Sequence, residues 1–285
     1  MPELPEVETV RRGLLRHLLG RRLVRVEVRE PRLRRPVPAE LAPALAGRRL
    51  ERVERRGKYL LLTFAGKRVL LLHLGMSGRL LLDRPEPFSR HEHLRFGFEG
   101  GRRLSFIDPR RFGIVDLLAE AELERDPRLR ALGPEPLAEG FDGTLLWCRL
   151  QGRRLGLKAA LLDQTILAGL GNIYACEALY HARLHPLRPA GSLSRQGCRR
   201  LAAAIRHTLE AALAAGGSSL RDFVAADGML GLFQHRFAVY GREGEPCGRC
   251  GRAIQRLREG GRSTFYCPKC QRRRGHWTGG RGRCL

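Results

Sequence analysis

The feature that most constrains the fold is a quartet of cysteines near the C-terminal end of the chain. Cys247 and Cys250 form one Cys-x2-Cys pair, Cys267 and Cys270 form another, and sixteen residues separate the pairs. In a cytosolic protein this spacing favours a zinc site over disulfides. Four thiolates close a tetrahedral structural site and leave no open position for catalysis. The sequence therefore predicts one structural zinc ion in a small hairpin domain.

The other four cysteines stand alone in the sequence. Cys148, Cys176 and Cys198 lie in apolar or helical segments, and we expect them to be small buried hydrophobes. Cys284 lies in the tail and is expected to be a free thiol.

The charge of the chain points to a polyanionic partner. Lys and Arg number 53 against 29 Asp and Glu, which gives a formal net charge of +24 over 285 residues. No long uncharged apolar run spans a bilayer, and Glu3, Glu6 and Glu8 interrupt any apolar leader at the start. We therefore expect a cytoplasmic protein that binds nucleic acid rather than membrane.

The N-terminal half is predicted to be a helix followed by antiparallel strands. Apolar positions recur at helical spacing over 4–18, and Gly20 follows. In 22–30, Val24, Val26 and Val28 alternate with charged residues, as in a half-buried strand. Further strands are expected over 59–64, 68–74, 78–82, 93–98 and 103–108.

The C-terminal half is predicted to be helical as far as the cysteines. After a linker rich in turn residues, helical patterns cover 144–150, 157–167, 172–182 and 193–215, and Gly216-Gly217 ends the last of them. The segment after Gln271 is rich in Gly and Arg and is expected to be disordered.

The opening residues, PELPEVETV, admit two interpretations. Pro2 and Pro5 fit the first turn of a helix, where a missing N–H costs nothing, and the glutamates complement the helix dipole. Alternatively, removal of Met1 exposes Pro2 as a reactive N-terminal amine. The residues alone leave both open.

Several turns carry candidate contact residues. Met76 in HLGMSG, and Arg110 and Phe112 in DPRRFG, suit either the core or insertion between base pairs. Lys58 stands at the start of a predicted strand, where it is either a phosphate contact or a solvated strand end. Asn172 follows a GLG turn at a helix N-terminus, which is a ready phosphate site or a plain connection between helices.

Taken in order, these motifs resemble bacterial formamidopyrimidine-DNA glycosylase, a family of base-excision repair enzymes for oxidised purines. The matching segments lie between Pro2 and Gln271: PELPEVETVRRG, RRGKYLLL, HLGMSG, DPRRFG, LGPEPL, GLGNIYACEAL and VYGREGEPC with its cysteines. The resemblance implies an α+β multidomain chain: an N-terminal helix with an antiparallel β-sandwich, a helix–two-turns–helix domain and a C-terminal four-cysteine zinc finger.

The resemblance also implies a mechanism. Pro2, freed of Met1, is a secondary amine that attacks C1′ of the damaged nucleotide, and Glu3 is the general acid. The resulting iminium permits β- and δ-elimination, so the enzyme is both a DNA-formamidopyrimidine glycosylase and a DNA-(apurinic or apyrimidinic site) lyase. Lys58 and Arg262 match positions tied to these steps.

The implied partner is damaged double-stranded DNA. The protein is expected to be a monomer without an obligate protein partner, and to be cytoplasmic and associated with the nucleoid. Met76, Arg110 and Phe112 match the residues that fill the void left by a flipped base. The backbone contacts implied by the resemblance are His91, Arg153, Lys158 and Asn172.

We expect five segments in the chain. A catalytic β-sandwich domain covers 1–131, a linker 132–143, a helix–two-turns–helix domain with a lesion-capping loop 144–236, the zinc finger 237–271 and a basic tail 272–285.

The capping loop departs from the family pattern. Ala226 stands where a hydroxyl residue is expected, and Met229 and Leu230 are more apolar than is typical. These departures bear on the choice between 8-oxoguanine and ring-opened purines. Two alternatives remain: an endonuclease VIII-like glycosylase for oxidised pyrimidines, and a non-catalytic zinc-finger protein that binds damaged DNA.

Overall fold

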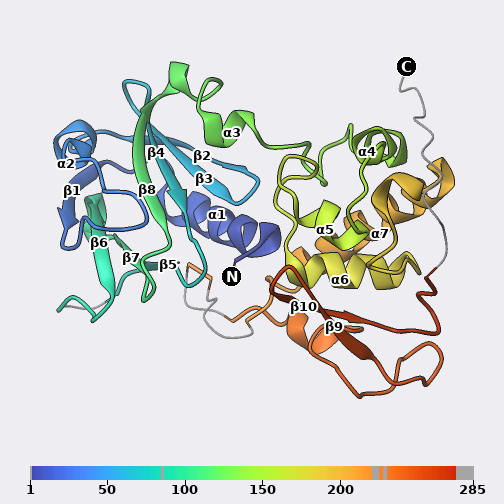
Figure 1. The fold of residues 1–285 in the computed structure, drawn as a ribbon. Helices are drawn as coiled ribbons and strands as arrows, with labels where there is room; N and C mark the ends of the chain where they lie inside the picture. The colour runs from blue at the N-terminus through green and yellow to red at the C-terminus, as the bar shows by residue number, and fades with distance from the viewer. Residues whose placement is uncertain (1, 85–86, 220–224, 227–229, 274–285) are drawn as a thin grey trace. The chain divides into compact units, whose positions relative to one another are not determined.

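The computed structural model describes residues 2–84, 87–219, 225–226 and 230–273, and they form two compact units (Figure 1). Unit 1 comprises 1–130 and 212–234, and unit 2 comprises 131–211 and 235–285. The predicted boundaries at 131, 143, 236 and 271 stay predictions, since the units group the chain more coarsely.

Helix α1 (Leu4–Leu18) opens unit 1, as predicted. Pro5 lies in its first turn, where no N–H is required, and Glu6 complements the helix dipole there. Val7, Val10, Leu14 and Leu18 are fully or almost fully buried and belong to the same core as residues of the sheets. Gly20, with φ 79°, ends the helical path because it tolerates the left-handed conformation.

Two four-stranded antiparallel sheets form the rest of unit 1, in the orders β1-β6-β7-β5 and β2-β3-β4-β8 (Figure 1). Both contribute buried side chains to the single core that α1 joins, and this arrangement confirms the predicted sandwich. The strands are β1 (Leu23–Val28), β2 (Leu50–Arg56), β3 (Tyr59–Phe64), β4 (Arg68–His73), β5 (Arg79–Leu82), β6 (Glu92–Phe98), β7 (Arg103–Ile107) and β8 (Ile114–Ala119).

The valine face of β1 corrects one expectation. Val24 is 60% exposed and Val28 is 38% exposed, whereas Val26 between them is partly buried and packs against the core. The strand lies at an edge of its sheet, and its register shifts between Leu23 and Arg25, so Leu23 points into the core instead. Strands β2 and β8 and helix α2 (Leu41–Leu45) were not specified by the sequence pattern.

The first segment of unit 1 ends with the short helix α3 (Pro127–Arg130). Unit 2 contains three short helices, α4 (Gly143–Leu150), α5 (Leu157–Leu162) and α6 (Asn172–His181), and most of the 20-residue helix α7 (Arg195–Ala214). Helix α5 ends five residues earlier than predicted, where Asp163 leaves helical geometry and accepts hydrogen bonds from Thr165. Short 3-10 turns lie at Glu99–Gly101, Glu120–Glu122, Ala190–Ser192 and Phe233–Arg236.

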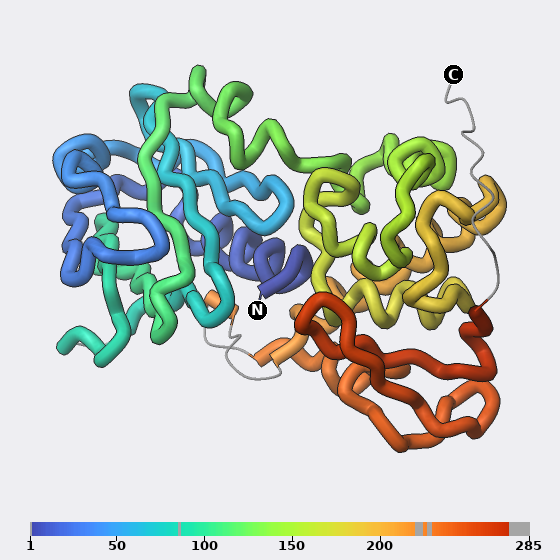
Figure 2. The backbone as a smooth tube through the Cα atoms, in the orientation of Figure 1, coloured from blue at the N-terminus to red at the C-terminus, as the bar shows by residue number. Residues whose placement is uncertain are grey.

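The last part of unit 2 is a two-stranded hairpin of β9 (Gln255–Glu259) and β10 (Arg262–Tyr266), which lie side by side in Figure 2. Its small core combines Cys247, Cys267 and Phe265 with Cys176 and Tyr180 from α6. Apolar contacts in this shared core therefore pack the finger on α6.

Cys176 and Cys198 are buried as expected, whereas Cys148 is only partly buried. Cys284 and the segment from 274 lie outside the described residues. Within the described part of the chain, no helix is both long and apolar enough to cross a bilayer.

Candidate functional site

The N-terminal residues are anchored by a buried carboxylate. Pro2 is buried and Glu3 is 2% exposed. Glu6, 1% exposed, accepts a 2.9 Å hydrogen bond from the Glu3 backbone N–H through Oε2. Its Oε1 accepts from the backbone N–H of Ser218 at 2.8 Å and from the Ser218 hydroxyl at 3.1 Å. Glu6 therefore fixes the start of the chain against the segment that follows α7.

Lys58 lies in the turn between β2 and β3, half-buried. His73, which pairs with Tyr59 across β3 and β4, has its pKa lowered to about 4 by burial and by the nearby charges of Lys58 and Arg34. Its neutral Nδ1 accepts a 3.0 Å hydrogen bond from the Gly75 N–H. The strand register thus places Lys58 near the turn that carries Met76.

The HLGMSG and DPRRFG turns are joined by Asp108, which is fully buried. Its Oδ1 accepts from the Ser77 hydroxyl at 2.6 Å and from the Arg110 N–H at 3.2 Å, and its Oδ2 accepts from the Gly113 N–H at 2.7 Å. Gly75, at φ 62°, approaches so closely that a β-carbon there would lie 2.5 Å from the Phe112 carbonyl. One carboxylate and one glycine therefore fix the two turns together.

The three predicted insertion residues project from these joined turns. Met76 is 40% exposed and Phe112 is 41% exposed, so both large apolar side chains reach solvent on these turns. The Arg110 guanidinium stacks over the Phe112 ring at 4.6 Å. His91 is half-buried, and its carbonyl accepts a hydrogen bond from the Asp108 N–H at 3.0 Å. Unit 1 thus brings these residues to one rigid pair of turns.

Unit 2 holds the remaining predicted contacts, and it uses two of them internally. Lys158 is 1% exposed, and its ammonium contacts the Thr264 hydroxyl on β10. Burial lowers its pKa, and the charge of Arg262 adds to the effect. Asn172 donates a 2.9 Å hydrogen bond from Nδ2 to the Ser263 carbonyl. Arg153 is exposed. Lys158 and Asn172 therefore fasten the finger hairpin to α5 and α6.

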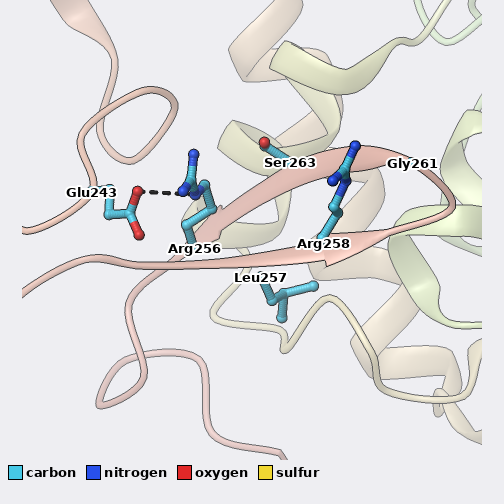
Figure 3. Close-up of a pocket in the computed structure, with 6 residues that line it drawn as sticks. All are labelled: Glu243, Arg256, Leu257, Arg258, Gly261 and Ser263. Carbon is cyan, nitrogen blue, oxygen red and sulfur yellow. Dashed lines mark ion pairs between the residues drawn. The ribbon is translucent and has the colours of Figure 1, made fainter.

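The hairpin presents a basic face. In Figure 3, Arg256, Arg258 and Ser263 extend from one side of the strands, and Leu257 extends from the other. Glu243 forms a 2.9 Å ion pair with Arg256 and leaves Arg258 at the far end of this face. Arg262 is exposed at the first position of β10. Cations on a small hairpin are suited to contact a phosphate backbone.

The four predicted cysteine ligands converge. All four Sγ atoms lie within 4.8 Å of one another. Cys247 and Cys270 are 3.9 Å apart, and Cys250 and Cys267 are 3.5 Å apart. A tetrahedron with Zn–S bonds of about 2.3 Å has S–S edges of about 3.8 Å. The cluster fits one structural zinc ion, which confirms the predicted cofactor.

Sequence reasoning missed a positioning residue on α6. Glu177 is fully buried and accepts hydrogen bonds from the backbone N–H groups of Ala238, Val239 and Tyr240 at 2.8–3.0 Å. Burial raises its pKa, and these three bonds oppose the rise. Its one sequence signal was a single acid inside the apolar stretch NIYACEALYH. Glu177 holds the segment that leads into the finger.

Comparison with known proteins identifies the family. Three family models match in order: the formamidopyrimidine-DNA glycosylase N-terminal domain over 1–115, the H2TH domain of the same enzymes over 132–224, and the zinc finger found in FPG and IleRS over 244–273. The chain belongs to the formamidopyrimidine-DNA glycosylase family. Its three modules match the predicted fold class of sandwich, helix–two-turns–helix domain and zinc finger.

Relatives of the family match along almost the whole chain. Formamidopyrimidine-DNA glycosylase of Cereibacter sphaeroides is 52% identical over 284 residues, covering 95% of this chain and 100% of the relative. That of Laribacter hongkongensis is 53% identical over 274 residues with the same coverage.

Solved structures agree with the sequence matches. The MutM (FPG) protein of Thermus thermophilus aligns with a TM-score of 0.86 at 45% identity, covering 95% of this chain and 98% of that one. A Lactococcus lactis FPG variant in complex with Fapy-dG-containing DNA aligns with a TM-score of 0.89 at 36% identity, covering 95% and 100%.

The departures from the formamidopyrimidine-DNA glycosylase pattern fall in different surroundings. Ala226 is 1% exposed in the core of unit 1, its carbonyl accepts from the Leu82 N–H at 2.8 Å, and its β-carbon lies 3.0 Å from where a β-carbon at Gly13 would be. Leu230 is 63% exposed. Met229 lies outside the described residues.

Proposed function

We propose that the protein is a bifunctional DNA glycosylase and AP lyase of base-excision repair that removes oxidised purines. The observation that carries the proposal is the match at 52% identity to a formamidopyrimidine-DNA glycosylase that is covered over its full length. The family is one of glycosylases with AP lyase activity, and its members have been solved with DNA containing Fapy-dG, carbocyclic 8-oxo-G or an abasic site.

Pro2 is the proposed nucleophile. Once Met1 is removed, its secondary amine has a pKa of roughly 8, so part of it is unprotonated near neutral pH. Attack on C1′ forms the N–C1′ bond and breaks the bond to the base. Loss of the amine proton and opening of the C1′–O4′ bond of the sugar then give the iminium, which accepts electrons in the later eliminations. Glu3, adjacent in sequence and buried, is the general acid that protonates the sugar ring oxygen or the leaving base. Support comes from the Glu6 hydrogen bonds that fix this turn.

Lys58 and Arg262 are proposed to bind phosphates and assist the eliminations. Lys58 lies in unit 1 near His73, and Arg262 stands exposed at the start of β10 in unit 2. Both are cations at family-motif positions, which supports the roles.

Met76, Arg110 and Phe112 are proposed to fill the duplex when the damaged nucleotide is flipped out. Unstacking costs a few kcal/mol per step. Side chains already exposed on fixed turns lose less conformational entropy on insertion than residues of a flexible loop. His91, Arg153, Lys158 and Asn172 complete the proposed DNA contacts, the last two through the hairpin that they position.

The protein is proposed to act as a monomer on duplex DNA in the nucleoid region of the cytoplasm. A net charge of +24 favours rapid, salt-sensitive association with DNA.

The test is a lesion panel. Untagged protein is incubated with duplexes that carry 8-oxoguanine opposite cytosine, a formamidopyrimidine, or oxidised thymine, and the cleaved ends are analysed. We expect purine lesions to be cut fastest, with phosphate at both ends of the gap. Faster cutting of oxidised thymine would favour an endonuclease VIII-like preference, and cutting of none would contradict the proposal.

A further inference from the structure

A second basic pocket lies in unit 2, at the C-terminal end of α6. It borders the two Cys-x2-Cys turns, 247–250 and 267–270, which are called the zinc knuckles below. Six cationic side chains line it, drawn from the segment after α6, from α7 and from the zinc knuckles: Arg183, Arg188, Arg200, Arg249, Lys269 and Arg272. None of the residues that line it is a carboxylate. The one histidine, His185, has its pKa lowered by burial and by Arg273, so it adds no charge near neutral pH.

The zinc cluster does not neutralise this charge. One Zn2+ with four thiolates carries a net charge of −2, which leaves a surplus of about four positive charges around the pocket. Among the described residues, no carboxylate pairs with Arg183, Arg200, Lys269 or Arg272. Arg188 shows the crowding, because burial and the charge of Arg200 lower its pKa. Like charges gathered without a paired carboxylate create a positive potential that favours an anion.

Arg183 lies directly after the C-terminal end of α6. Its φ is 56°, and the Leu184 N–H donates a 3.0 Å hydrogen bond to the Leu179 carbonyl, so this left-handed residue closes the end of the helix. Arg183 is therefore part of an ordered turn, and it is one of the residues that line the pocket.

The pocket is separate from the contacts predicted for unit 2. Helix α6 begins at Asn172, which bonds Ser263 of the hairpin, and ends near Tyr180, whose carbonyl accepts a 2.7 Å hydrogen bond from Arg249. Ten helical residues span about 15 Å. The basic pocket therefore lies about that far from the end of α6 that carries the predicted phosphate contacts.

We propose that this pocket binds backbone phosphates of DNA that flanks the duplex segment held at Arg262 and the hairpin that Lys158 and Asn172 position. The proposal rests on the proposed function only in taking DNA as the partner. The lining residues include no Phe, Tyr or Trp on which a base could stack, and arginine and lysine side chains bind backbone phosphates. The site therefore adds affinity without sequence preference, and it lengthens the footprint of the protein on DNA.

The test uses the full chain with Arg183→Gln, Arg200→Gln and Arg272→Gln combined. A matched control replaces three exposed arginines of unit 1, at Arg25, Arg35 and Arg68, with glutamine. Affinity is measured by anisotropy across a salt series on two lesion duplexes, about 12 and about 40 base pairs long. Zinc content is measured in each protein to confirm an intact finger.

We expect the pocket variant to lose about tenfold in affinity for the long duplex, and its salt slope there to fall by about two to three. Its affinity for the short duplex and its cutting of the short duplex should match those of the wild-type protein, as should the control on both duplexes. An unchanged slope on the long duplex overturns the proposal, even if the variant loses binding to phosphatidylglycerol vesicles or to inorganic phosphate.

Equal losses on both duplexes also overturn it, because the residues would then belong to the lesion-binding surface. Failure of the proposed function can be told apart from failure of this inference. In that case the wild-type protein would cut no lesion, while the pocket variant would still lose affinity for the long duplex and not for the short one.

Discussion

The Ser77 hydroxyl donates a 2.6 Å hydrogen bond to Oδ1 of Asp108, and so joins two turns that lie 31 residues apart in the sequence. The exposed side chains proposed to enter the duplex stand on these two turns. The same carboxylate also accepts the backbone N–H groups of Arg110 and Gly113. The two turns are therefore expected to enter DNA as one rigid body.

Asp108→Asn tests this coupling. The amide has one acceptor atom where the carboxylate has two, so a buried donor loses its partner at a cost of about 1–3 kcal/mol. We expect removal of 8-oxoguanine to fall by about tenfold, a barrier change of about 1.4 kcal/mol. Cutting at a preformed abasic site, where flipping costs less, should fall less.

Ser77→Ala is the milder comparison, because it removes one of the three bonds to Asp108. Equal losses on the two substrates in Asp108→Asn, in proportion to the loss in thermal stability, would show that Asp108 serves the fold alone.

Glu3→Gln separates binding from chemistry. The amide has almost the same size and stays in the same buried turn, but it carries no acidic proton for the leaving base. We expect lesion-DNA affinity close to that of the wild-type protein, and base release lowered by at least about 100-fold in single-turnover assays.

The matched control is Glu8→Gln, which alters another buried acid of α1, one that pairs with Arg11 and Arg55. That variant should lose stability and keep base release. Wild-type release by Glu3→Gln would contradict the assigned role of Glu3.

Loss of the zinc ion should disturb the hairpin more than the rest of the chain. Cys247 is buried in the same small core as Cys176 and Tyr180, so Cys247→Ser opens both the metal site and the packing on α6. We expect bound zinc near zero by elemental analysis and DNA affinity lowered by at least about tenfold, since phosphate contacts of the hairpin carry affinity.

Cys148→Ser, at a partly buried thiol far from the cluster in sequence, is the control. Unchanged affinity in zinc-free Cys247→Ser would refute a role for the finger in binding.

Acidification should weaken unit 1 through His73. Burial, with the charges of Lys58 and Arg34, lowers its folded pKa to about 4 from the ordinary 6.5, so the unfolded chain binds the extra proton first. The stabilising contribution is complete above pH 6.5 and is lost as pH falls from 6.5 to about 4. It amounts to about 3 kcal/mol at most, at about 1.36 kcal/mol per pKa unit.

The measurement is the melting temperature against pH for the wild-type protein and His73→Gln. The difference between their profiles should be flat above pH 6.5 and should change between 6.5 and 4. Parallel profiles through that window would contradict the account.

Much of the architecture was accessible from the sequence because its signals are local. Helix α1 followed from an apolar period of 3.6, strand β3 from a short apolar run, and the zinc cluster from cysteine spacing. Strand β2 was not predicted, since its charged pattern gains its strand state from pairing with β3. Strand β8 was not predicted either, although its run Ile114–Ala119 is as long as β3; it pairs with β4.

The supporting residues of the site could not be predicted in the same way. Glu6 was expected only to complement a dipole, yet it bonds Ser218, 212 residues away. Lys158 was expected to face DNA, and the structure buries it against Thr264. Contacts between positions so far apart depend on the packed fold, and no local pattern encodes them.

The central claim, that the amine of Pro2 forms the covalent bond to DNA, is tested most directly by borohydride trapping. Untagged protein shown to lack Met1 is mixed with a duplex carrying 8-oxoguanine opposite cytosine, the reductant is added, and the cross-linked peptide is sequenced by mass spectrometry. We predict a covalent adduct at Pro2 that disappears when an uncleaved N-terminal tag blocks the amine. A full yield of adduct in the tagged protein, or an adduct mapped to Lys58, would contradict the account.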